Sequence, residues 1–73
     1  MKGWTVDGEK LRAERTRAAL SMRDLEERSG IRVITIYRIE TGRVKHAYPS
    51  TIRRLAEALG IAPAALMREA DHG

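Results

Sequence analysis

Residues that end or begin helices divide this chain into short segments, and they constrain its fold more than any other feature of the sequence. Single glycines stand at Gly30, Gly42 and Gly60, and the two prolines are Pro49 and Pro63. Glycine is typical of the residue after a helix, and proline is well tolerated in the first turn of a helix. The spacing therefore predicts several short helices joined by turns, without a linker or a repeat.

The segments between these residues carry helical patterns. Asp7 suits an N-cap, and Ser21 with Asp24 is close to a capping box. The β-branched residues of segment 32–41 would also suit a strand, but no other run in the chain looks extended, so a helix is the better interpretation. We expect a first helix over residues 7–19, a second that begins at Ser21 and stops around Ser29, a third over 32–41, a fourth over 49–60, and a short last one that begins at Pro63 and contains Leu66 and Met67. One face of the first is expected to hold Leu11, Ala18 and Ala19, and to be apolar apart from Arg15. The predicted fold class is all-α.

Size and composition restrict the functions that the chain can have. A chain of 73 residues buries about 60% of its unfolded surface, which disfavours a deep catalytic cleft. The chain has no cysteine, and His46 and His72 lie far apart without a carboxylate cluster, so we expect no metal and no cofactor. The serines are better explained as cap and turn residues than as nucleophiles, and we expect no enzyme. With no signal peptide and no membrane span expected, the predicted location is the cytoplasm.

Positive charge is concentrated in one stretch of the chain. Residues 32–54 hold six Lys or Arg and a single acidic residue, Glu40, whereas the other fifty residues hold eight basic and nine acidic ones. This distribution is expected of a protein that meets a polyanion on one side. Solvated helix faces are the simpler alternative explanation.

The second and third predicted helices are joined by a three-residue turn, which is the spacing of a helix-turn-helix. In that motif the second helix lies in the major groove of DNA. At 100° per residue, Ile36 and Ile39 share one face of this helix, whereas Ile34, Tyr37 and Arg38 share the opposite face. Such an exposed face suits base edges, because arginine can bond guanine and aliphatic groups can contact thymine methyls. Alternatively, Val33 and Ile34 pack under the basic loop that follows, residues 43–48, or against a partner chain.

The chain resembles the lambda-repressor-like, Cro-type helix-turn-helix proteins, also called the XRE family. The resemblance rests on four motifs in the order and spacing of the family: GEKLRAER (8–15), LSMRDLEERSGI (20–31), TIYRIETGR (35–43) and TIRRLAEALGI (51–61). It implies a compact five-helix DNA-binding domain over residues 7–70, after an N-terminal arm (1–6) and before a polar tail (71–73). It also implies a bacterial or phage-encoded transcription regulator, usually a repressor, that binds an inverted repeat in double-stranded DNA as a homodimer.

The resemblance assigns roles to individual residues. The direct base contacts are expected at Arg32, Val33, Ile34, Tyr37 and Arg38. Contacts with phosphate position the protein on the duplex but do not read its sequence. They are expected at Arg23, Thr35, Thr41, Arg43, Lys45 and His46. A structural salt bridge is expected between Arg15 and Glu40, which helical spacing also turns inward. The dimer interface is expected at Ile61, Pro63, Ala64 and Met67, although Ile61 and Leu66 could simply complete the core of one copy.

Two residues depart from the pattern of the family. Met22 stands where a glutamine commonly touches the DNA backbone, so a contact there would come from a main-chain N–H or from Arg23. Glu26 stands where a small alanine usually lets two helices approach. We expect its carboxylate to reach solvent or to pair with Arg38 or Arg32.

A competing hypothesis of another class uses the same exposed face. An antitoxin-like or other protein-interaction module would bind a protein through Val33, Ile34 and Tyr37. Its binding should tolerate salt, whereas DNA binding should fall steeply with salt. Trp4 is expected either to pack over the first helix or to belong to the N-terminal arm.

Overall fold

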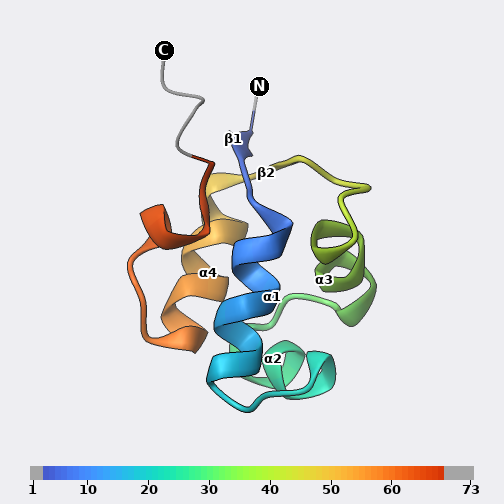
Figure 1. Cartoon of the computed structure of the whole chain (residues 1–73), viewed down its shortest axis with the longest axis vertical. Helices are drawn as coiled ribbons and strands as arrows, with labels where there is room; N and C mark the ends of the chain where they lie inside the picture. The colour runs from blue at the N-terminus through green and yellow to red at the C-terminus, as the bar shows by residue number, and fades with distance from the viewer. Residues whose placement is uncertain (1–2, 69–73) are drawn as a thin grey trace.

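A computed structural model describes residues 3–68. Within this range the elements are β1 (Trp4–Thr5), α1 (Gly8–Arg17), α2 (Met22–Ser29), α3 (Val33–Glu40), β2 (His46–Ala47), α4 (Pro49–Leu59) and a 3-10 helix, η1 (Pro63–Leu66). Helix α4 packs against α2 and η1, whereas α1 packs against α3 and η1. Helix α2 crosses one end of the bundle, and the two strands lie at the opposite end (Figure 1). Helix α3 lies beside α1 with its outer face uncovered by any other element (Figure 1).

Local caps fix the ends of the helices. The Asp7 carboxylate accepts hydrogen bonds from the backbone N–H groups of the first turn of α1, at 3.0 and 3.2 Å. Ser21 and Asp24 form a reciprocal capping box at the start of α2, with both bonds at 2.9 Å. Gly30 and Gly60 follow α2 and α4 in the left-handed conformation, with φ of 77° and 70°. The helix boundaries predicted at these residues are confirmed.

The core is formed by one apolar face from each helix. Both core residues predicted on α3, Ile36 and Ile39, are fully buried, and the helix periodicity assigned to segment 32–41 is confirmed. The complete set of buried apolar residues is Val6, Leu11, Leu25, Ile36, Ile39, Ile52, Leu55, Ala56 and Leu66. The prediction for the end of α1 was wrong, because the helix ends at Arg17 and both Ala18 and Ala19 are exposed. Ala19 has a φ of 60°, so the chain turns there toward α2 and leaves the helix face.

The fifth predicted helix is only the four-residue 3-10 helix η1, so the described residues hold four α-helices. The chain leaves η1 in an extended conformation at Met67, with φ −105° and ψ 153°. It does so because the N-terminal segment bonds to it: Asp7 N–H donates to the Leu66 carbonyl at 2.8 Å, and Arg68 N–H donates to the Thr5 carbonyl at 3.3 Å. Pairing with the N-terminal segment therefore replaces a further helical turn.

The two short strands were not predicted, because two residues are too few to show an alternating pattern. Strand β1 pairs antiparallel with β2, with Trp4 opposite Ala47 and Thr5 opposite His46. Residues 3–6, expected as part of an arm, are thus bonded on one side to the basic loop and on the other to the segment after η1. The Trp4 side chain remains partly exposed. The predicted tail, residues 71–73, lies outside the described residues.

Helix α1 begins at Gly8, which lies close to the backbone of α3. A Cβ atom added at Gly8 would lie 2.0 Å from the carbonyl oxygen of Ile39. Gly8→Ala should therefore lower the free energy of unfolding by about 1–3 kcal/mol, as overpacking does, although alanine is the better helix former. Urea unfolding would measure this change, with Arg12→Ala on the exposed face of α1 as the control. A Gly8→Ala protein as stable as the parent would show that the close approach does not require glycine.

Candidate nucleic-acid interface

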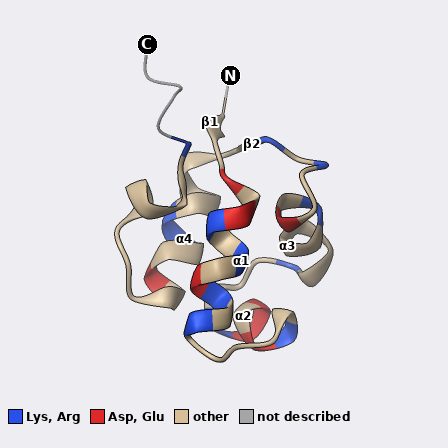
Figure 2. Cartoon of the chain, in the orientation of Figure 1, with Lys and Arg blue, Asp and Glu red and all other residues tan. Residues whose placement is uncertain are grey.

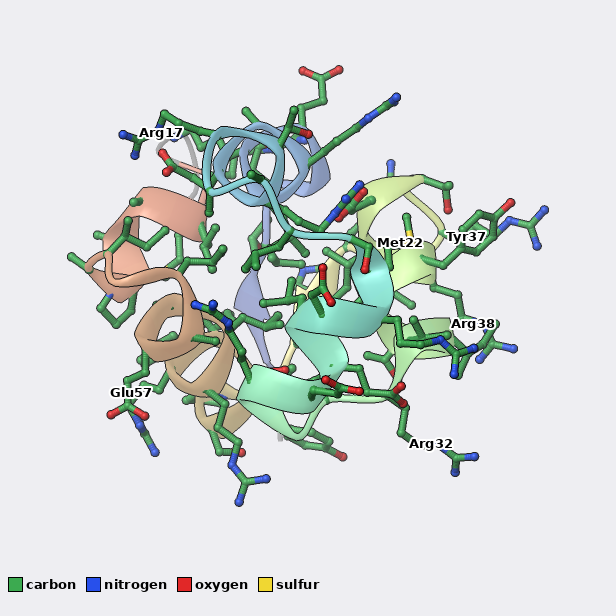
Figure 3. All side chains as sticks on the ribbon, turned by 90° about the horizontal axis from the view of Figure 1, so that it is seen from below. Arg17, Met22, Arg32, Tyr37, Arg38 and Glu57 are labelled. Carbon is green, nitrogen blue, oxygen red and sulfur yellow. The ribbon has the colours of Figure 1, made fainter. Side chains whose placement is uncertain are left out.

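Helix α3 is anchored by one face and presents the other. Ile36 and Ile39 fix its inner face in the core, whereas Ile34 and Tyr37 are each 44% exposed. Figure 3 shows Arg32, Tyr37 and Arg38 projecting to the same side of the molecule, away from α4, with Arg17 and Glu57 on the far side. The structure therefore brings the predicted base-contacting residues together on one surface. We call this surface the α3 face, defined by Arg32, Val33, Ile34, Tyr37 and Arg38.

The α3 face combines apolar groups with free cations. Arg32 and Arg38 are exposed, and neither side chain forms an ion pair with a residue of the described range. Val33 is only partly buried, at the first turn of the helix. Unpaired guanidinium groups beside half-exposed aliphatic and aromatic side chains can bond and contact base edges.

The basic loop after α3, residues 43–48, is held at both ends. The N–H groups of Arg43 and Val44 both donate to the carbonyl oxygen of Arg38, at 2.9 and 3.1 Å. The N–H of Val6 donates to the carbonyl oxygen of Lys45 at 2.9 Å, next to the pairing of β1 with β2. The side chains of Arg43, Lys45 and His46 remain exposed, and Figure 2 shows basic residues on the loop between α3 and β2. The hydrogen bonds therefore hold the backbone of the loop in place, whereas the charged side chains are not restrained.

The other residues predicted to contact phosphate differ in their exposure. Arg23 is exposed in the first turn of α2. Thr41 is exposed, but its hydroxyl donates to the Tyr37 carbonyl oxygen at 2.8 Å. Thr35 is partly buried and lines a surface pocket with Val44 and residues of β2. Arg23 is therefore the most available of the three.

Arg15 and Glu40 lie in contact and join three parts of the chain. Arg15 Nε donates to Glu40 Oε2 at 2.7 Å and Nη2 donates to Oε1 at 3.0 Å, while Nη1 donates to the Leu20 carbonyl at 2.8 Å. The two side chains are 14% and 3% exposed. The hydrogen bonds to Glu40 raise the pKa of Arg15 above its ordinary value. This network fixes the C-terminal end of α3 to α1 and to the turn before α2.

Of the two alternatives predicted for Glu26, solvent or an arginine, the pairing with Arg32 or Arg38 was wrong. Glu26 Oε2 accepts a hydrogen bond from the backbone N–H of Val33 at 3.2 Å, and no ion pair joins it to Arg32 or Arg38 within residues 3–68. Met22 is partly buried and packs against the core, as an apolar side chain in its position can.

Sequence reasoning missed two features of the basic stretch. Tyr48 is 64% exposed at the N-cap of α4, where it is the last residue of the basic loop, and its place directly before Pro49 was the available signal. Arg54 lies away from the loop, with Nη1 3.9 Å from where a Cβ of Gly30 would be, at the C-terminal end of α2. There it complements the negative end of the α2 dipole.

The residues predicted for a dimer interface lie around η1. Ala64 is exposed, and Pro63 is partly buried. Ile61 and Met67 are partly buried and pack against the core, and Leu66 is fully buried there. Leu66 therefore completes the core of one copy.

The described residues contain no group of three His, Cys, Asp or Glu side chains that could hold a metal ion. None of their helices is long and apolar enough to span a bilayer.

Comparisons with known proteins agree with a helix-turn-helix fold. A family model described as a helix-turn-helix domain matches residues 8–70. The HTH-type transcriptional repressor RghR of Bacillus subtilis (strain 168) is 42% identical over 65 residues, which are 89% of this chain and 48% of RghR, so the chain spans about half the length of this relative. The crystal structure of the restriction-modification controller protein C.AhdI from Aeromonas hydrophila is similar, with a TM-score of 0.76 and 33% identity, covering 82% of this chain and 89% of that one.

Proposed function

Since this chain belongs to the lambda-repressor-like, XRE-type helix-turn-helix family, we propose that it is a transcription regulator that binds double-stranded DNA in a sequence-specific manner. The observation that carries the proposal is the α3 face, where free guanidinium groups flank half-exposed Ile34 and Tyr37. Helix α3 enters the major groove, and the regulator acts as a repressor rather than as an enzyme. RghR is named a transcriptional repressor and C.AhdI a restriction-modification controller, and both names support a regulatory role.

The residues of the α3 face read the bases. Arg38 and Arg32 bond guanine, and Val33, Ile34 and Tyr37 provide apolar contacts with thymine methyl groups and neighbouring bases. Phosphate contacts orient the domain on the duplex. They come from Arg23, Thr35, Thr41, Arg43, Lys45 and His46. The exposure of the three loop residues and of Arg23 supports this assignment.

The protein acts as a homodimer on an inverted repeat, with residues 7–70 as the DNA-binding unit. Two copies of α3 can then enter successive major grooves about 34 Å apart. Ile61, Pro63, Ala64 and Met67 form the dimer interface around η1, and the exposed Ala64 next to partly buried apolar residues supports this place. We place the protein in the cytoplasm of a bacterium or of the host of a phage, where it meets DNA.

A selection of tight-binding duplexes from random DNA, followed by salt titration of the winner, tests the proposed function. We expect an enriched inverted repeat and a slope of log affinity against log salt near −7, since the four basic phosphate contacts of each subunit, eight in the dimer, each contribute about −0.9. Arg43→Gln and Lys45→Gln should each reduce the slope by about 2 in the dimer. Arg17→Gln, on the opposite side of the molecule in Figure 3, should leave it unchanged.

The same experiment distinguishes a second candidate function. The half-exposed Ile34 and Tyr37 would also suit an antitoxin-like protein-interaction surface. Absence of any enriched duplex, with weak and uniform binding to all DNA, would contradict the proposed regulator and favour that alternative.

A further inference from the structure

The first turn of α3 is capped from another helix. Arg32 occupies the N-cap position, with φ −64° and ψ 146°, but no side-chain hydrogen bond caps the helix from there. An arginine side chain has five donors and no acceptor, so it cannot accept a bond from a backbone N–H. The acceptor comes instead from α2, because Glu26 Oε2 lies 3.2 Å from the Val33 nitrogen.

This bond meets a physical need of α3. The first N–H groups of a helix have no partner within the helix, and an unpaired one that is partly buried is unfavourable. A carboxylate at this end also interacts favourably with the helix dipole. The same residue also takes part in the end of α2, where its carbonyl oxygen accepts the N–H of Gly30 at 2.8 Å. Its side chain reaches Val33 and thereby links α2 directly to α3 beside the turn.

We propose that Glu26 is a positioning residue for DNA recognition, which caps α3 from α2 and thereby leaves the N-cap position to an arginine that faces the DNA. The inference rests on the proposed function. An N-cap residue with a side-chain acceptor folds that side chain back onto its own helix, whereas Arg32 is exposed and projects from the α3 face (Figure 3). Because the Glu26 carboxylate holds the first turn of α3, the angle at which Arg32, Val33 and Ile34 meet the bases is fixed before DNA binds.

The carboxylate has a second effect that follows from its charge. A helix N-terminus attracts phosphate, and Glu26 already occupies this end of α3 with a carboxylate of the chain itself. The DNA backbone is therefore repelled from the first turn, which leaves that turn to the bases. Loss of the charge alone should strengthen binding to any duplex, whereas loss of the hydrogen bond should weaken the preference for one sequence.

Three variants separate these effects. Glu26→Gln keeps an oxygen acceptor and removes the charge. Glu26→Ala removes both the acceptor and the charge. Glu26→Ala combined with Arg32→Ser provides a different cap at the N-cap position, because a serine there can accept from the N–H of the second or third residue of α3, while the N–H of Val33 stays without the carboxylate.

Unfolding in urea reports the cap without DNA. We expect Glu26→Ala to lower the folding equilibrium constant about fivefold, Glu26→Gln less than about twofold, and the double variant to recover part of the loss. An unchanged equilibrium constant in Glu26→Ala would overturn the cap.

The positioning role is tested by DNA binding under conditions in which every variant is folded. Two affinities are measured for each variant: one for the selected duplex and one for an unrelated duplex. In Glu26→Ala the ratio of the two affinities should fall about tenfold, which is the discrimination contributed by roughly one base pair. In Glu26→Gln the ratio should be largely kept, while both duplexes are bound more tightly than by the parent. The double variant should be stable but should lose the contact of Arg32.

A ratio unchanged in Glu26→Ala would overturn the positioning role and leave a structural cap. A parent protein that selects no duplex would overturn the proposed function, and the positioning role with it, while the unfolding data would still decide the cap.

Discussion

Glu40→Ala is expected to lower the free energy of unfolding by about 3 kcal/mol, because it leaves the Arg15 guanidinium without its carboxylate in a site where the Arg15 side chain is only 14% exposed. Arg15 would keep its bond to the Leu20 carbonyl, which places the effect at the low end of the range for a broken buried pair. A domain of 73 residues has roughly 4–11 kcal/mol of stability in total. The variant should therefore melt more than about 10 °C below the parent, as circular dichroism or Trp4 fluorescence would measure.

A double variant tests whether the uncompensated charge is the cause. Arg15→Met with Glu40→Leu removes both charges and keeps apolar volume, and such replacements are often neutral. We expect this variant to be more stable than Glu40→Ala alone. If it were no more stable, the loss would instead reflect the packing of the two side chains at the junction of α1 and α3.

The parts of the fold that could be predicted from the sequence depend on local interactions. Asp7 and Ser21 cap helices through hydrogen bonds to residues two or three positions away, so the local pattern contains the information needed. Gly30 follows α2 in a conformation that glycine adopts at little cost. The inward face of α3 follows from helical periodicity, and Ile36 and Ile39 are buried as predicted.

The parts that could not be predicted depend on residues far apart in the sequence. The strands and the extended chain at Met67 form because residues 3–6 pair with segments more than forty positions away. Glu26 was expected to reach solvent or to pair with an arginine, but its carboxylate accepts a hydrogen bond from a backbone N–H across the turn. For the candidate site, the sequence predicted which residues share the α3 face, whereas the way in which the first turn of α3 is held required the structure.

Arg38→Ala should have the largest effect of any single substitution on the α3 face. The Arg38 side chain is exposed and forms no ion pair within residues 3–68, so its guanidinium is free to bond a guanine, a contact that discriminates bases by about 1–3 kcal/mol. We expect affinity for the selected duplex to fall roughly 5- to 150-fold per half-site, with relaxed preference at one base pair. Quantitative binding to a panel of duplexes that differ at single positions would measure both effects.

The fold should not change in this variant, which makes the loss interpretable. The contacts that Arg38 makes to the basic loop come from its backbone carbonyl, which accepts from Arg43 and Val44 whatever the side chain is. Stability should therefore remain within about 0.5 kcal/mol of the parent. Arg23→Ala is the matched control: as a phosphate contact, its loss should weaken binding to all duplexes alike and leave the base preference intact. If Arg38→Ala instead weakened all duplexes equally, Arg38 would contact phosphate, and the reading of bases would fall to Arg32 and the apolar residues of the α3 face.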